Sequence, residues 1–443
     1  MWKRILVASA AVLFLSGCAF FVEDRIHYAW TPGADTPCAD CTPELLGPTI
    51  VGVALSGGGS RASVYGAAAL EILAEEGILD HATYLSSVSG GGFPAAYYAL
   101  NKPQPCSTDR VATDCESESF SAFKAAMRHD FLGAMTVRQI KKPNRISSPT
   151  RRLSSLQDVL DEQFIGGAEF GELPQKPVLL INGARYDDAR RFVFSNVAIP
   201  EDENTVRQFS DPTLRTASFS QAGCTRATPQ NFSVALAVAI SAGFPPLLGP
   251  AAIKMSETCD GGADHYWHLG DGGILDNSGV ETIEDYALRA ATAGQRVTRV
   301  IIFSIDAGRS SAPEEMMQQR NLKLWTTDPG RVVDIVSKRA TAYRRVALQQ
   351  LADDADVSMT IIKMRYTDAE LAAFPRSCRD ADNRRDTLPD ALAKVPTSLR
   401  ISDCDADLME LAADDVVRRA LAENREIIDI ILSEVAAVAA SSD

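Results

Sequence analysis

Short apolar runs alternate with segments of helical periodicity along most of the chain. Residues 49–55 form a β-branched run that predicts a buried strand, and residues 84–88 are a second candidate strand. Glycines follow each run, and apolar residues then recur at helical spacing over residues 62–76 and 94–100. Because strand, turn and helix repeat in this order, we predict a three-layer α/β/α fold with a mostly parallel sheet.

The alternation continues with four more candidate strands, at residues 178–182, 192–195, 300–305 and 358–364. Residues 234–253 form another long apolar run, but prolines and glycines interrupt its second half. We therefore predict a buried helix and a loop there, rather than a membrane span.

Changes in composition divide the rest of the chain into parts. Residues 19–47 are rich in Pro, Asp and Thr, which predicts a tether with local turns. Residues 48–310 hold the predicted core, and its polar segment 102–150 is either a lid or a closed loop without a gating role. Residues 311–443 are typical of a mainly helical extension packed on this core, ending in an amphipathic stretch.

The N-terminus carries a targeting pattern. Lys3 and Arg4 precede an apolar run that is too short to span a bilayer, and the run ends in Leu-Ser-Gly-Cys at Cys18. These features resemble the signal peptide and lipobox of bacterial lipoproteins, over residues 1–18. The resemblance implies a lipid on Cys18 and attachment to the bacterial cell envelope. Ala19, in place of an aspartate, points to the outer membrane.

The net charge of the chain argues against two classes of binding partner. The chain has a formal net charge of −14, which argues against a nucleic-acid partner because such proteins need a basic face. It also argues against attachment to anionic lipid through a polybasic patch. We therefore expect the membrane to be reached through the N-terminal lipid.

Eight cysteines remain besides Cys18, and an oxidising compartment would allow them to pair. Pairing of sequence neighbours is the hypothesis we favour, because each pair encloses a polar segment: 38–41, 106–115, 224–259 and 378–404. Zinc at Cys38 and Cys41 is the alternative, but no second Cys-x-x-Cys and no suitably spaced histidine pair accompanies them. We expect no metal and no cofactor.

Gly57, Gly58 and Gly59 follow the first predicted strand and precede a helix. Such a loop can direct backbone N–H groups at a developing negative charge, as an oxyanion hole requires. Arg61 belongs to the same candidate loop, either bracing it or contacting the substrate. A dinucleotide-binding loop is the alternative, but the next strand lacks the acidic residue that this fold uses.

Ser89 follows the second predicted strand in the order Ser87-Val88-Ser89-Gly90-Gly91. This order is similar to a nucleophile elbow, Gly-x-Ser-x-Gly, with Ser87 in place of the first glycine. The replacement leaves Ser87 as an alternative nucleophile, although only Ser89 has a glycine two positions later and a helix just beyond. A serine–glycine turn without chemistry is the structural alternative.

Asp271 lies between glycines in Gly270-Asp271-Gly272-Gly273, where it is open to a neighbouring serine or forms a simple turn. A serine hydrolase usually places a histidine between acid and nucleophile. None of the five histidines follows residue 268, and none is in a recognisable triad context. A catalytic pair without histidine therefore fits better.

The glycine loop, the serine elbow and the later Asp-Gly-Gly, in this order, resemble the patatin-like phospholipases over residues 49–310. Residues 182–185 and 237–246 are similar to segments of the same family. The resemblance implies a modified α/β-hydrolase sheet and a dyad in which Asp271 activates Ser89. It implies a serine acyl hydrolase acting on phospholipids or lysophospholipids. The alternatives are an esterase or thioesterase on soluble acyl substrates, and a non-catalytic envelope lipoprotein that binds lipid. The oligomeric state is left open.

Overall fold

The computed structural model describes most of the chain from residue 47 onward. The described residues are 28–29, 45, 47–105, 117–146, 148–197, 213, 215–218, 230–245, 247–254, 266–292, 294–308, 331–378 and 387–441. The predicted signal peptide, the predicted lipidation site at Cys18 and six of the other cysteines lie outside these ranges.

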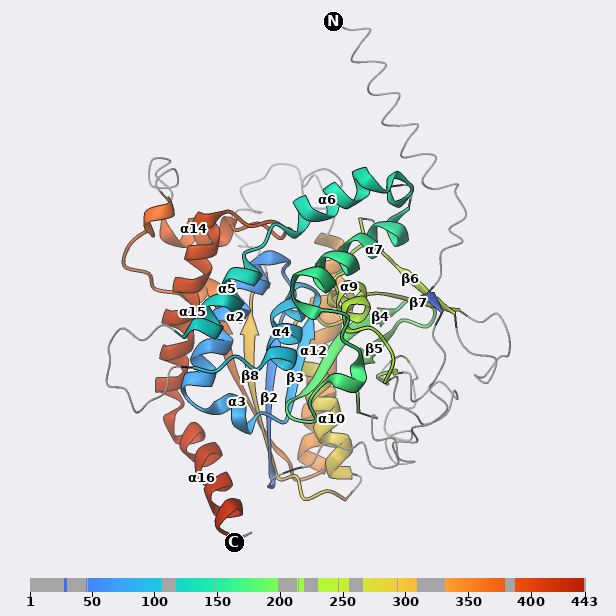
Figure 1. The fold of residues 1–443 in the computed structure, drawn as a ribbon. Helices are drawn as coiled ribbons and strands as arrows, with labels where there is room; N and C mark the ends of the chain where they lie inside the picture. Colours follow the sequence, from blue (N-terminus) through green and yellow to red (C-terminus); the bar gives the residue numbers. More distant parts are fainter. Residues whose placement is uncertain are drawn as a thin grey trace, which may run out of the picture.

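A mixed nine-stranded sheet forms the centre of the described molecule (Figure 1). The strands are β1 (Tyr28–Ala29), β2 (Thr49–Leu55), β3 (Tyr84–Val88), β4 (Val178–Arg185), β5 (Arg190–Phe194), β6 (Ala251–Lys254), β7 (Tyr266–Asp271), β8 (Arg299–Asp306) and β9 (Ser358–Arg365). Their order is β1-β6-β7-β4-β3-β2-β8-β9, with β5 paired to β4. The pairs β3–β4, β2–β3, β2–β8 and β8–β9 are parallel, whereas β7 runs antiparallel to both β4 and β6. The predicted mostly parallel sheet is thus present.

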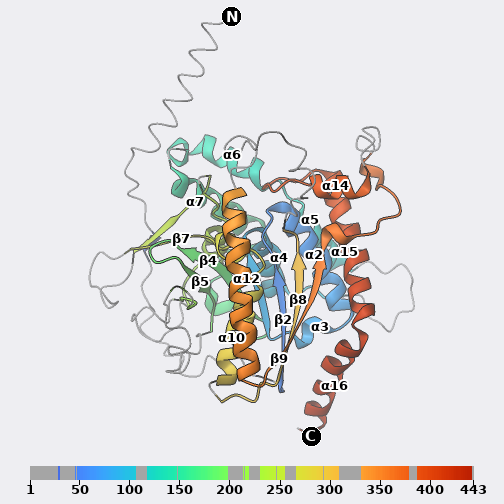
Figure 2. The same cartoon turned by 180° about the vertical axis from the view of Figure 1, so that it is seen from behind.

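Helices cover both faces of this sheet (Figure 2). On one face lie α2 (Ser60–Glu75), α3 (Ile78–His81), α4 (Gly92–Asn101), α5 (Glu118–Met127), α6 (Phe131–Lys141), α7 (Pro149–Leu160) and α9 (Val234–Ser241). The other face is covered by α10 (Val280–Thr292) and α12 (Arg331–Asp354). The result is the three-layer α/β/α arrangement expected from the sequence.

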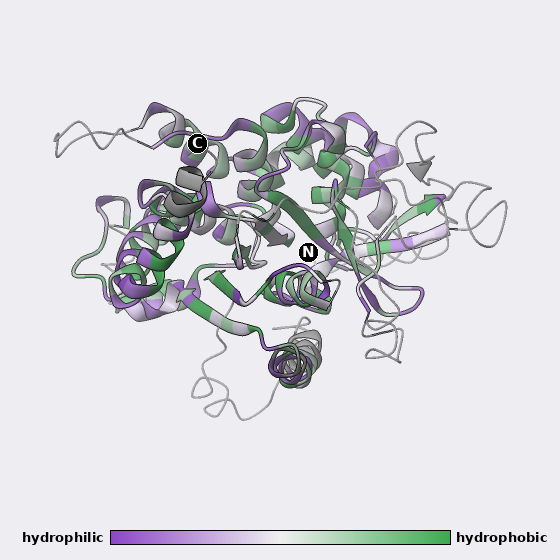
Figure 3. Cartoon of the chain, turned by 90° about the horizontal axis from the view of Figure 1, so that it is seen from below, coloured by the Kyte–Doolittle hydropathy of each residue, from purple (hydrophilic) through white to green (hydrophobic). Residues whose placement is uncertain are grey.

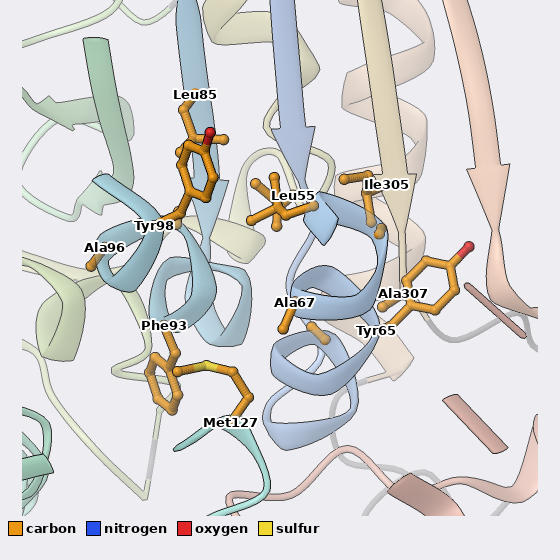
Figure 4. Close-up of a cluster of buried hydrophobic side chains, with 14 of the residues drawn as sticks. Leu55, Tyr65, Ala67, Leu85, Phe93, Ala96, Tyr98, Met127, Ile305 and Ala307 are labelled. Atoms are coloured by element: carbon orange, nitrogen blue, oxygen red, sulfur yellow. The ribbon is translucent and has the colours of Figure 1, made fainter. Parts of the chain in front are cut away.

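Apolar side chains from the central strands and the first helical layer meet in the larger core cluster (Figure 4). Leu55 of β2 and Leu85 of β3 contribute from the sheet, and Phe93 of α4 and Met127 of α5 contribute from the helices; all four are fully or almost fully buried. Figure 3 shows the same distribution, with the most apolar ribbon in the strands and polar residues on the outer helices. Burial of this apolar surface is the main stabilising contribution to such a fold.

The C-terminal part contributes helices and one strand. It contains α14 (Leu388–Lys394), α15 (Asp403–Glu423) and α16 (Arg425–Ser441), and α15 packs along α2. β9 pairs with β8 along its whole length, so this part completes the sheet as well as covering it. A disulfide joins Cys378 to Cys404, as predicted; the other three predicted pairs lie outside the described residues. No described helix is long and apolar enough to cross a bilayer.

Two predicted segments have more structure than their composition indicated. The polar segment 102–150 contains α5 and α6, and Phe120 and Phe123 of α5 are fully buried in the core. That part of the segment therefore belongs to the body of the domain. Within the predicted tether, Tyr28–Ala29 form β1 and pair in parallel with β6.

Candidate active site

Ser89 occupies a sharp turn between β3 and α4. Its φ is +51°, a left-handed conformation that is unusual and strained for a residue with a side chain. Gly91, two positions later, is needed for close packing, because a Cβ there would lie 2.6 Å from the carbonyl oxygen of Ser56. This is the geometry of a nucleophile elbow. Ser87 is fully buried within β3, whereas Ser89 is partly exposed.

The register of β4 brings Ser89 and Asp271 together. Val88 of β3 pairs with Asn182 of β4, and the next residue of β4, Gly183, pairs with Asp271 at the end of β7. The Ser89 hydroxyl donates a hydrogen bond to Oδ2 of Asp271 at 2.9 Å. Two residues 182 positions apart therefore form one serine–carboxylate pair.

Asp271 is buried without a compensating cation among the described residues. Its side chain is 3 % exposed, and its Oδ1 accepts a hydrogen bond from the amide of Gly273 at 2.7 Å. Burial raises the pKa of Asp271 to about 7, although the hydrogen bonds from Gly273 and Ser89 act in the opposite direction. A carboxylate with a pKa near neutrality is a much stronger base than an ordinary surface aspartate.

The glycine loop approaches Ser89, but its three amides are not equivalent. The amide of Gly57 donates to the carbonyl of Asn277 at 3.0 Å, so the prediction that it is an oxyanion donor needs correction. The amides of Gly58 and Gly59 have no hydrogen-bond partner within the described chain. Gly58 has φ +157° and Gly59 has φ +61°, and the latter requires glycine because a Cβ there would lie 2.2 Å from the carbonyl oxygen of Ser398. Two donors thus remain for an oxyanion.

Arg61 is also removed from the predicted oxyanion hole. Its side chain is almost fully buried and donates to the carbonyl oxygens of Ala307 and Val395 at 2.9 and 2.8 Å. Its guanidinium also lies over the ring of Tyr366. These contacts connect the start of α2 to the end of β8 and to the C-terminal part. Arg61 therefore stabilises the position of the glycine loop and does not line the oxyanion hole.

Sequence reasoning missed the role of Ser241, at the end of α9. Its hydroxyl accepts a hydrogen bond from the amide of Ser89 at 2.9 Å and donates to the carbonyl of Asn182 at 2.5 Å. The amide group of Asn182 in turn donates to Ser86 Oγ and to the carbonyl of Ser87. This buried network holds the elbow in place. The family-like segments 182–185 and 237–246 contained both residues, and that was the available signal.

Other candidates have structural partners. Asp276, which follows the Asp-Gly-Gly motif, accepts from Ser278 and caps α10. His268 pairs with Asp187, and no described histidine hydrogen-bonds to Ser89 or Asp271. Within the described ranges, no three His, Cys, Asp or Glu side chains are grouped closely enough to hold a metal ion.

The fold and the site together define an α/β protein that presents a serine and an aspartate beside a glycine loop. The family model described as patatin-like phospholipase matches residues 53–283, about half of the chain. This protein therefore belongs to the patatin-like phospholipase family. No curated protein is significantly similar to it in sequence.

Solved structures that align with this chain include human GIVD cytosolic phospholipase A2, at 12 % identity and a TM-score of 0.45, covering 87 % of this chain and 60 % of that chain. VipD from Legionella pneumophila aligns at 13 % identity and a TM-score of 0.32, covering 85 % of this chain and 67 % of that chain. The protein thus spans about three fifths of the length of the human phospholipase.

Proposed function

We propose that the protein is a serine acyl hydrolase that cleaves fatty-acyl esters of phospholipids or lysophospholipids. The observation that carries this proposal is the 2.9 Å hydrogen bond from Ser89 to Asp271, in which a partly exposed hydroxyl meets a buried carboxylate. Membership of the patatin-like phospholipase family supports a lipid ester as the substrate class.

In the proposed reaction, Ser89 Oγ attacks the ester carbonyl carbon while its proton passes to Oδ2 of Asp271. The tetrahedral intermediate then collapses, and the same proton passes to the leaving alcohol, which leaves an acyl ester on Ser89. A water molecule next attacks this ester and gives its proton to Asp271. Collapse releases the fatty acid, and the proton returns to Ser89.

The amides of Gly58 and Gly59 are the proposed donors to the oxyanion. They adjoin the N-terminus of α2, where the helix dipole favours negative charge. A donor of this kind contributes about 3 kcal/mol to transition-state stabilisation in other serine hydrolases. The strained turn at Ser89 keeps the nucleophile at this position throughout the reaction.

We also propose that a lipid on Cys18 attaches the protein to the bacterial cell envelope, with the outer membrane as the site. The support is the targeting pattern of residues 1–18, which ends in Leu-Ser-Gly-Cys. Metabolic labelling with an alkyne fatty acid tests this proposal, and a Cys18→Ser variant is expected to lose the label.

The test of the catalytic proposal uses two serines that are two residues apart. Wild type is expected to react with a fluorophosphonate probe and to release fatty acid from phospholipid vesicles. Ser89→Ala is expected to lose both reactions, whereas Ser87→Ala, which changes a buried serine of β3, is expected to retain the label.

The results of these assays distinguish a phospholipase from a general esterase and from a non-catalytic protein. Labelling of Ser89 together with hydrolysis of soluble esters only would make the protein a general esterase or thioesterase. Absence of label and of hydrolysis in folded wild type would leave a non-catalytic lipid-binding protein. Vesicle hydrolysis by Ser89→Ala at the wild-type rate would refute the dyad.

A further inference from the structure

Exposed apolar side chains gather on one edge of the described molecule. Among the described residues, nine large hydrophobic side chains are well exposed, and six of them lie in α6, in the turn after it, or in the loop after α9. We call these six the apolar rim: Leu132, Val137, Ile140, Ile146, Phe244 and Leu247. Such concentration, unlike scattered exposed residues, marks an interaction surface.

Helix α6 is apolar on both of its faces. Phe131 and Met135 are buried against the core, whereas Val137 is 50 % exposed and Ile140 is 68 % exposed on the outer face. A helix at a water-facing surface normally presents polar residues outward. The outer face of α6 is therefore suited to an apolar partner.

The two halves of the rim adjoin each other and the active site. The amide of Gly249 donates to the carbonyl of Pro149, and Thr150 Oγ1 donates to the carbonyl of Pro250, so the loop after α9 lies against the start of α7. This loop begins just after Ser241, which binds the Ser89 amide. Figures 1 and 2 show α6 at the end of the molecule toward which β8 points, and Ser89 follows the parallel strand β3 at that same end.

Cations surround the rim although the whole chain is acidic. Residues 131–152 contain six Lys or Arg residues and no Asp or Glu. Arg138 and Arg145 pair with Glu162 and Asp158. Lys141 and Lys142, at the end of α6, are exposed, although Lys142 Nζ also lies 3.9 Å from Asp158. Apolar residues flanked by lysines are the pattern of helices that lie in the interface of an anionic bilayer.

The N-terminal chain is held close to this edge. β1 (Tyr28–Ala29) pairs with β6, which begins at Ala251, directly after the loop that carries Phe244 and Leu247. Cys18 is ten residues before Tyr28, so a lipid on it would be within about 35 Å of β1 along an extended chain. A bilayer that held this lipid would be within reach of the rim.

We propose that the apolar rim, together with Lys141 and Lys142, docks on the surface of an anionic phospholipid bilayer and presents the Ser89 site to it. This inference rests on the proposed function for the identity of the substrate, but binding to the bilayer does not depend on hydrolysis. The rim adds an orienting contact to the lipid anchor, because an anchor on a tether does not by itself direct the active site toward the membrane.

The experiment uses the full-length chain with Cys18→Ser, which removes the anchor, and with Ser89→Ala, which removes hydrolysis. Its binding to vesicles of equal parts phosphatidylcholine and phosphatidylglycerol is measured by flotation. The variants Val137→Gln, Ile140→Gln and Leu247→Gln keep the charge unchanged, and each is expected to weaken binding about tenfold. The matched control is Val346→Gln on α12, an equally apolar residue that is 68 % exposed outside the rim, and it is expected to bind as the parent does.

The lysines test the electrostatic part. Lys141→Gln and Lys142→Gln are each expected to weaken binding about fivefold on the anionic vesicles and to leave binding to pure phosphatidylcholine unchanged. In the Ser89-containing chain, the rim variants are expected to lose vesicle hydrolysis without a parallel loss on a short water-soluble ester. If wild type hydrolyses neither vesicles nor the soluble ester, the proposed function fails while the binding assay still tests the rim.

Equal vesicle binding by the rim variants and the Val346→Gln control would overturn the proposal. So would a change of oligomeric state in the rim variants, measured by light scattering, without a change in vesicle binding, because the rim would then be a contact between copies of the chain. Circular dichroism melting of each variant verifies folding, and the side chains changed in the rim, lysine and control variants are exposed.

Discussion

Two buried aspartates, one at the end of β7 and the other in α10, show how surroundings determine the use of a carboxylate. Asp271 is 3 % exposed, and its partners are a serine hydroxyl and one backbone amide. Asp285, in α10, is 1 % exposed but forms an ion pair with Arg289 at 3.0 Å and lies 3.7 Å from Arg344 of α12. The two aspartates are about equally buried, but only Asp285 has arginine side chains close to its carboxylate.

The two carboxylates titrate in opposite directions for this reason. Burial raises the pKa of Asp271 to about 7. At Asp285 burial acts in the same direction, but Arg289, Arg344 and Arg191 outweigh it and hold its pKa well below the ordinary value. Asp271 can therefore exchange a proton near neutrality, while Asp285 remains charged and joins α10 to α12. A buried carboxylate without a nearby cation is thus suited to proton transfer. A buried carboxylate with nearby arginines is suited to holding two helices together.

The largest expected effect is that of Asp271→Asn on turnover. Removing the proposed base is expected to lower kcat/KM for a phospholipid or soluble ester by about 10⁴-fold. The free energy of unfolding is not expected to fall, since the variant removes a buried carboxylate that lacks a cation. Asp187→Asn, near the same strand, is the control and should keep its activity. Comparable activity in the two variants would contradict the role of Asp271.

The reverse result is expected for Asp285→Asn. Asp285→Asn removes the buried carboxylate that pairs with Arg289 and lies near Arg344, and it is expected to lower the free energy of unfolding by about 3–5 kcal/mol. Urea denaturation measures this change. Asp429→Asn removes an exposed pair with Arg425 and is expected to cost less than about 1 kcal/mol. If Asp285→Asn lowers activity per folded molecule as strongly as Asp271→Asn, the distinction between a catalytic and a structural aspartate is wrong.

The dependence of activity on pH follows from the raised pKa of Asp271. The ionised carboxylate is the active form, so kcat/KM should rise tenfold per pH unit below about 7 and level off above it, which makes it about a hundredfold lower at pH 5. The linkage to stability has the opposite sign. The folded state holds this proton more tightly than the unfolded chain, so Asp271 increasingly lowers stability as the pH rises from about 4 through 7. A kinetic midpoint near 4 would show that the carboxylate is not shielded from water.

The smallest expected effect is at Ser241. Ser241→Ala leaves the partly buried amide of Ser89 without its acceptor and is expected to lower kcat about tenfold, with little change in KM. Ser241→Thr keeps a hydroxyl and should restore most of the rate. Ser233→Ala, which removes the cap at the other end of α9, is the matched control and should affect stability but not kcat. Equal kcat values for the two alanine variants would make Ser241 a purely structural residue.

Much of the fold could be predicted because local patterns and tertiary structure agree. The predicted strands at residues 49–55 and 84–88 match the bounds of β2 and β3, and each is followed within two residues by the glycines of a turn. The predicted C-terminal amphipathic stretch proved to be two helices, α15 and α16, with Asn424 between them. No apolar pattern distinguishes one long helix from two that meet end to end.

The net charge of the whole chain does not describe the charge at one part of its surface. The net charge of −14 argued against a basic membrane patch, yet residues 131–152, which contain four of the six rim residues, are locally basic. The acidic residues that dominate the total lie mostly elsewhere in the chain. Electrostatic attraction depends on the charges within a Debye length of the contact, about 8–10 Å, and the total does not describe them.

The sequence by itself determined the α/β class, the glycine loop, the serine elbow and the candidate aspartate, because each depends on a short run of residues with local conformational needs. Only the tertiary structure decided which amides of the loop are free, since Asn277, 220 positions after Gly57, occupies one of them. It also decided that Asp271 would lie beside Ser89 with no described cation near it. Hydrogen bonds and burial join residues that are distant in the chain, and no local pattern contains that information.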